Sequence, residues 1–219
     1  MKSELYLSHP DAQFWADFSF VDFSDGYLDS MSESISKALT SMNELEGGAI
    51  ANPDENRMVG HYWLRDAELA PNEELTHAIR ETLAKVKEVA EAVHSGSLQS
   101  PLGDFTDLLV IGIGGSALGP QFVGKALGHP NTNKLRVHFF DNTDPDGLDH
   151  TLSEIGDALS TTLALVISKS GGTPETRNGM LEAENAFTQK GLDFSRHAIA
   201  ITGDGSKLHQ YSQEKGWLD

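Results

Sequence analysis

Two segments rich in serine and glycine carry the residues of this chain that could do chemistry. The first spans residues 112–119, Gly-Ile-Gly-Gly-Ser-Ala-Leu-Gly, and follows the apolar run Leu108–Ile111. Its glycines allow a tight turn and a close approach to a ligand, and Ser116 stands where a helix should begin. Because the free N–H groups and the dipole of a helix start attract anions, this segment predicts a phosphate-binding loop.

The second segment repeats this arrangement with more polar groups. Residues 167–176 read Ile-Ser-Lys-Ser-Gly-Gly-Thr-Pro-Glu-Thr and offer the hydroxyls of Ser168, Ser170 and Thr173. Two adjacent glycines let backbone N–H groups converge, and the Thr-Pro pair opens a helix whose dipole points into the loop. Lys169 either adds a positive charge to a phosphate site or plays a structural role. A single loop of this kind could be an ordinary turn, but two of them favour a monophosphate site.

The elements that position these loops follow from the hydrophobic pattern. Apolar runs alternate with helical patterns, which predicts an α/β fold with a parallel sheet covered by helices on both faces. Both loops fall at carboxyl ends of strands, where such sheets bind ligands. The predicted strands are 108–113, 135–140, 163–168 and 197–202, and the predicted helices begin near Ala117, at Pro145 after Asp144, at Pro174 after Thr173, and after Ser206.

The chain before these strands has a different hydrophobic pattern. Apolar residues recur at three-to-four spacing over 32–45 and 72–94, which predicts two packing helices. A turn-rich connector follows at 95–103. We therefore expect a mostly helical N-terminal region over 1–100 and an α/β domain over 101–219.

Composition excludes several classes of function. Thirty-three acidic and sixteen basic residues give a formal net charge of −17, so the general field repels nucleic acids and anionic membranes. An anion must then be held by local geometry. There is no cysteine, and the histidines lack metal-ligand spacing, so no metal site is expected. Without a recognisable signal peptide or a run of membrane-spanning length, we expect a cytoplasmic protein.

A dinucleotide site is the competing interpretation of the first loop. Gly112, Gly114 and Ala117 also fit the Gly-x-Gly-x-x-Ala fingerprint, and Asp141 ends the next predicted strand near the position of a ribose-binding acid. A nicotinamide-dependent dehydrogenase is therefore an alternative. The second loop argues against it, since a dinucleotide fold does not require one there.

Three segments together resemble the glucose-6-phosphate isomerase family. Residues 112–120 and 167–176 resemble its two phosphate-binding segments, and Asn52–Arg65 is similar to an upstream segment with the pattern Asn, Glu, Arg, Val, His and Leu-Arg. The widespread form of the second segment has an aromatic residue and two threonines after Ser-Lys-Thr. Gly171-Gly172-Thr173 stands there in this chain, a variant associated with bacterial and especially cyanobacterial members.

The resemblance implies a sugar isomerase domain that binds a sugar phosphate and interconverts glucose 6-phosphate and fructose 6-phosphate through an enediol, without metal or organic cofactor. It implies a homodimer at full length. The family's catalytic glutamate, arginine, histidine and lysine would lie downstream of Asp219, so we expect no catalytic residue here and an N-terminal fragment that lacks the last strand of its sheet. A non-catalytic sugar-phosphate-binding module is the alternative. The implied phosphate contacts are the hydroxyls of Ser116, Ser168, Ser170 and Thr173, with the N–H groups of Gly115 and Lys169 nearby.

Overall fold

The computed structural model describes residues 5–218. Contacts divide the chain into two compact units, one ending at Ala84 and the other beginning at Lys85, so the division falls inside the helix α3 (Glu73–Ser95). The domain boundary expected near residue 100 stays a prediction. Among the described residues, no helix combines the length and apolar character that crossing a membrane requires.

The first unit combines a hairpin with helices. Its two strands pair antiparallel and are joined by a short 3-10 turn. The residue after this turn, Gln13, has a left-handed backbone with φ at 50°. The Trp63 side chain is buried and its Nε1–H donates to the Glu46 carbonyl at 2.8 Å. The helix expected over 32–45 is confirmed, whereas the hairpin was not expected. The elements are β1 (Tyr6–His9), β2 (Phe14–Asp17), α1 (Tyr27–Ser30), α2 (Ser32–Glu46), the 3-10 turns Pro10–Ala12 and Ala67–Leu69, and the first part of α3.

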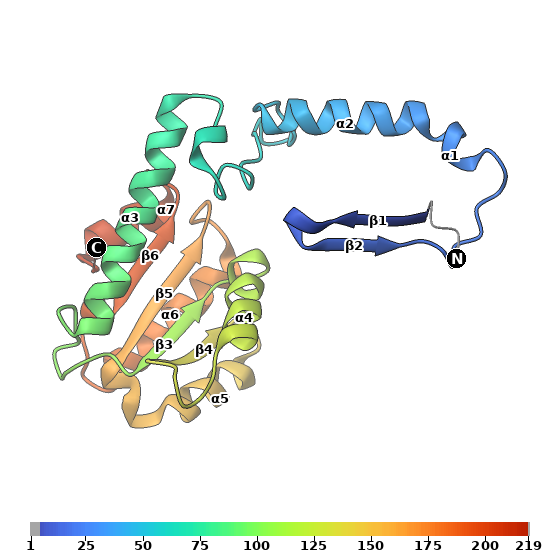
Figure 1. The fold of residues 1–219 in the computed structure, drawn as a ribbon. Helices are drawn as coiled ribbons and strands as arrows, with labels where there is room; N and C mark the ends of the chain where they lie inside the picture. The colour runs from blue at the N-terminus through green and yellow to red at the C-terminus, as the bar shows by residue number, and fades with distance from the viewer. Residues whose placement is uncertain (1–4, 219) are drawn as a thin grey trace. The chain divides into compact units, whose positions relative to one another are not determined.

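The second unit is a four-stranded parallel sheet in the order β4-β3-β5-β6 (Figure 1). The predicted alternation of strands and helices is confirmed, and the predicted ends differ from the observed ones by at most two residues. Short 3-10 turns span Gly156–Thr161 and Phe194–Arg196. The main elements are β3 (Asp107–Ile111), α4 (Gly115–Leu127), β4 (Arg136–Phe140), α5 (Pro145–Ile155), β5 (Thr162–Ser168), α6 (Pro174–Gln189), β6 (Ala198–Thr202) and α7 (Lys207–Lys215).

Apolar residues on both faces of this sheet build two clusters. Leu109 and Ile111 of β3 belong to the larger cluster, which α5, α6 and α7 complete, and Leu108 packs in the smaller cluster with Val93 of α3. Figure 1 shows the part of α3 that follows Ala84 in front of the sheet and α6 behind it. The β3–β4 and β5–β6 steps run in opposite directions, so right-handed crossovers place α4 on the face opposite α6. The strand order therefore reverses between β3 and β5, the usual position of a ligand site.

A buried charge fastens β3 to β4 at the amino end of the sheet. The Asp107 carboxylate, fully buried, accepts hydrogen bonds from His138 Nε2 at 2.8 Å, the Arg136 guanidinium at 3.0 Å and the Thr106 hydroxyl at 2.8 Å. Burial raises the pKa of Asp107, but these three hydrogen bonds and the Arg136 charge together outweigh it and hold that pKa below its usual value. The carboxylate therefore stays ionised and paired.

Candidate functional site

The first loop leaves β3 at a point where only glycine fits. A Cβ on Gly112 would lie 2.9 Å from the Ser116 Cβ and 3.2 Å from the Ile167 carbonyl oxygen of β5. Gly114, the N-cap of α4, has φ at 56° and ψ at −125°, a conformation that side-chain-bearing residues rarely adopt. These two glycines let α4 begin directly over the ends of β3 and β5.

Two hydrogen-bond donors at the start of α4 have no acceptor among the described residues. Ser116 is half-buried in the first turn, and its hydroxyl has no hydrogen-bond partner among the described residues. The Gly115 N–H is likewise unbonded within the described part of the chain, because the first turn of a helix lacks carbonyl partners. Both groups are thus available to an anion.

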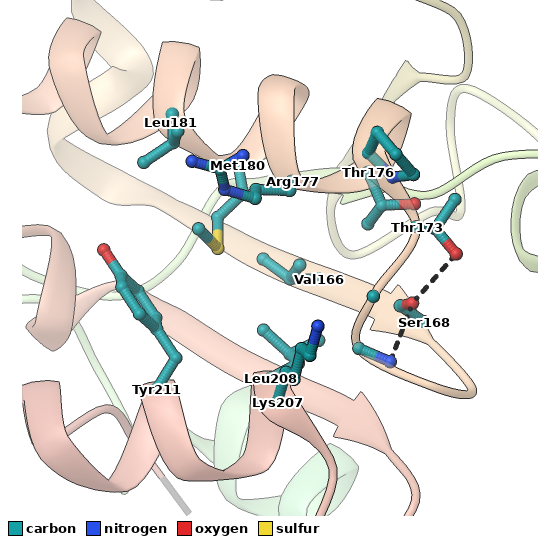
Figure 2. A pocket seen from close by; sticks show the side chains of 13 residues that line it. Val166, Ser168, Thr173, Thr176, Arg177, Met180, Leu181, Lys207, Leu208 and Tyr211 are labelled. Carbon is teal, nitrogen blue, oxygen red and sulfur yellow. Dashed lines mark hydrogen bonds between the residues drawn. The ribbon is translucent and has the colours of Figure 1, made fainter.

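The second loop holds its hydroxyls in a fixed arrangement. Ser168 ends β5 with a nearly buried side chain, and its Oγ accepts the Gly171 N–H at 3.2 Å and donates to Thr173 Oγ1 at 3.4 Å. Figure 2 shows both interactions at the mouth of a pocket. The Ser170 hydroxyl instead accepts the Gly172 N–H at 3.2 Å, and Ser170 is exposed. Thr173 is the N-cap residue of α6 and makes no capping bond with its side chain, as a ligand-facing hydroxyl should.

A third loop, between β6 and α7, supports the second one. The Thr202 hydroxyl donates to the Ser168 carbonyl at 2.6 Å and lies 2.7 Å from the Ser206 hydroxyl, while the Gly203 N–H donates to the Lys169 carbonyl at 3.2 Å. This supporting role was not expected from the sequence. The only available signal was the run Thr-Gly-Asp-Gly-Ser at the end of a strand.

Strand register brings the two predicted loops to neighbouring positions. Ile111 of β3 pairs with Val166 of β5, so both loops leave the same edge of the sheet, on either side of the strand-order reversal. The six residues expected to contact phosphate therefore lie on loops of adjacent strands, each of which leads into a helix. Their roles in binding stay predictions.

Asp141, the acid that a dinucleotide site would use, already accepts two hydrogen bonds within the chain. Asp141 Oδ2 accepts a hydrogen bond from Gln121 Nε2 at 2.6 Å, and Oδ1 accepts one from Asn142 at 3.0 Å. No group of histidine and acidic side chains suited to a metal ion occurs among the described residues.

Comparison with known proteins agrees with this geometry. A sequence model described as phosphoglucose isomerase matches residues 22–215. The chain belongs to the phosphoglucose isomerase family. This membership favours the sugar isomerase interpretation over the dehydrogenase alternative.

Named relatives are of the same kind. The chain is 56% identical over 210 residues to a glucose-6-phosphate isomerase from Synechococcus elongatus, covering 95% of this chain and 40% of that protein. It is 57% identical over 203 residues to one from a Geobacter species, covering 92% and 38%. Among solved structures, a glucose-6-phosphate isomerase from Chlamydia trachomatis aligns with a TM-score of 0.78 and 27% identity over 94% of this chain and 40% of that one. The chain thus spans about 40% of the length of the relatives it matches.

Proposed function

We propose that this chain forms the phosphate-binding part of a glucose-6-phosphate isomerase. The observation that carries the proposal is the pair of serine and glycine loops at the ends of β3 and β5, each opening into a helix of more than ten residues. In a chain of formal charge −17, oriented N–H groups, hydroxyls and helix dipoles must supply the attraction for a phosphate dianion. In the proposed enzyme, residues 1–100 are the helical N-terminal region and 101–219 the first sugar isomerase domain, and the full-length protein is a homodimer.

The proposed contacts divide between the two loops. From the first loop, Ser116 donates its hydroxyl and Gly115 its N–H. From the second loop, Ser168, Ser170 and Thr173 donate their hydroxyls and Lys169 its backbone N–H to the same phosphate. To donate to the phosphate, the Ser168 hydroxyl must turn its single proton away from Thr173, while the hydrogen bond from the Gly171 N–H holds the Ser168 oxygen in place.

Phosphate anchoring serves the chemistry at the other end of the sugar. Isomerisation moves a proton between C2 and C1 through an enediol, which requires a base, a group that stabilises the developing oxyanion, and an acid–base group for ring opening. Binding energy at the phosphate holds the reacting carbons in place for those groups. We assign none of the three roles to a described residue, and propose that the part of the relatives outside the match supplies them.

Calorimetric titration with glucose 6-phosphate tests the binding part of this proposal. A hydrogen bond to a charged group contributes about 1.5–3 kcal/mol, so Ser116→Ala should weaken binding about tenfold to a hundredfold. Ser153→Ala is the matched control, because its hydroxyl bonds only the Asp149 carbonyl on α5. Equal affinity of the Ser116 and Ser153 variants, or binding of unphosphorylated glucose as tight as that of glucose 6-phosphate, would refute the proposal.

A chimera tests the catalytic part. The chain replaces the corresponding 210 residues of the Synechococcus elongatus relative, and isomerase turnover is measured. We expect turnover in the chimera and none in this chain by itself. A folded chimera that binds glucose 6-phosphate but does not isomerise it would favour the non-catalytic binding module.

A further inference from the structure

A cavity of about 450 Å³ lies between the second loop, α6 and α7 (Figure 2). Its floor is apolar, with Val166, Met180 and Leu208 each at most 5% exposed. The Tyr211 side chain lines one side, and its hydroxyl donates to Glu184 at 2.8 Å. Burial and this carboxylate raise the pKa of Tyr211 to about 12, so the side chain is a neutral phenol near neutral pH. The volume and the apolar floor are typical of sites for small organic molecules.

Two cations line the same cavity. Arg177 extends from α6 and Lys207 from the first position of α7 (Figure 2). Neither makes an ion pair with a carboxylate among the described residues. The nearby Glu184 carboxylate is engaged by the Tyr211 hydroxyl. The cavity therefore presents positive charge beside an apolar surface, in a chain that is otherwise strongly acidic.

The second loop contacts the backbone of α7 directly, and this contact borders the cavity on the side of the predicted phosphate loops. Gly171 has φ at 65°, and a Cβ there would lie 2.3 Å from the Leu208 N of α7. Ser168 and Thr173 line the cavity as well as the second loop, whereas Ser116 does not line it. The cavity and the predicted phosphate site therefore share residues of the second loop. They differ in that Arg177 and Lys207 line the cavity, whereas Ser116 of the first loop does not.

We propose that this cavity is a further binding site, which takes a small organic anion. The apolar body of the ligand packs on Val166, Met180 and Leu208, and its phosphate or carboxylate is bound by Lys207 and Arg177. Because Ser168 and Thr173 border both sites, a ligand in the cavity changes the affinity of the loops for sugar phosphate. The cavity site itself does not depend on the proposed function, whereas its effect on sugar-phosphate affinity rests on that function.

Phenyl phosphate, which joins an aromatic ring to an anion, is the probe. Its binding to the whole chain is measured by calorimetry, first alone and then with glucose 6-phosphate present. The Arg177→Gln/Lys207→Gln double variant should bind the probe at least about tenfold more weakly. Lys87→Gln/Lys125→Gln removes the same charge from exposed positions on α3 and α4 and should change the affinity less than about twofold. Circular dichroism spectra confirm that all variants are folded.

Ser116→Ala separates this proposal from the sugar-phosphate proposal. We expect this variant to bind phenyl phosphate as the unaltered chain does. Loss of probe binding in Ser116→Ala, unchanged binding in the Arg177→Gln/Lys207→Gln variant, or no binding to the unaltered chain would each overturn the cavity site. None of these results decides whether glucose 6-phosphate binds, because that titration is made without the probe.

Discussion

Replacing Gly171 by alanine should destabilise the second unit far more than the same change at Gly205. Both glycines have a left-handed backbone, with φ at 65° and 67°, and both stand in loops at the carboxyl edge of the sheet. They differ in their surroundings. A Cβ on Gly171 would lie 2.3 Å from Leu208 N and 2.9 Å from Leu208 Cβ, whereas nothing lies within 4 Å of one on Gly205.

The expected loss of unfolding free energy follows from the left-handed backbone and from the steric overlap with α7. An alanine in the left-handed region costs about 1–2 kcal/mol at either position. At Gly171 the new methyl group also meets the backbone of α7, which cannot rotate aside as a side chain could, so α7 must shift. Overpacking of this kind costs about 1–3 kcal/mol more. We therefore expect a loss of about 2–5 kcal/mol in unfolding free energy for Gly171→Ala and about 1–2 kcal/mol for Gly205→Ala.

Urea denaturation followed by far-UV circular dichroism measures both variants. The difference between them isolates the contact of the second loop with α7, because the backbone strain is common to both. Losses that agree within about 0.5 kcal/mol would refute that contact, and with it the coupling of the cavity to the second loop.

Three further predictions concern buried or partly buried polar groups of the second unit. Asp107→Asn should cost about 1–3 kcal/mol, because it weakens the hydrogen bonds that a buried carboxylate accepts from His138, Arg136 and Thr106. Since the native pKa lies below 3.8, the stability from this carboxylate is present above pH 3.8 and is lost as pH falls through the native value, and acid titration of both proteins by circular dichroism checks this. Burial lowers the pKa of His197 below 6.5, so the unfolded chain binds the proton more readily than the folded one and stability falls as pH drops below 6.5. The urea midpoint of His197→Leu should therefore decline less over that pH range than the midpoint of the unaltered chain. Ultraviolet titration should find one tyrosine with a pKa of about 12, and Tyr211→Phe should remove it; persistence of that titration would contradict the assignment.

Local pattern predicted the second unit well because its strands are short apolar runs between clear helix signals. The start of β3 shows where that pattern stops. Asp107 is polar, so the apolar run begins one residue later, yet Asp107 pairs with Arg136 in the register and is fully buried. Its burial depends on His138 and Arg136, about thirty residues further along the chain, and no local signal reports such a partner.

The hairpin of the first unit and the supporting role of the third loop were not predicted, for related reasons. Phe14 and Trp15 of β2 favour strands, but they are more than half exposed, so no alternation between a buried and an exposed face marked the hairpin. Thr202 and Ser206 are ordinary loop residues by sequence. Their support of the Ser168 carbonyl exists only because β5 and β6 are neighbours in the sheet. The two phosphate loops were predictable because glycine, serine and an adjacent helix start all lie together in sequence.

The central claim is that the loops after β3 and β5 together bind the phosphate of a sugar phosphate. The most direct test is a titration of the isotope-labelled chain with glucose 6-phosphate, followed in amide proton–nitrogen correlation spectra. We predict the largest shifts at the N–H groups of Gly115, Ser116 and the second loop from Lys169 to Thr173, and no comparable shifts with glucose. Shifts concentrated elsewhere, or on only one of the two loops, would contradict a shared phosphate site.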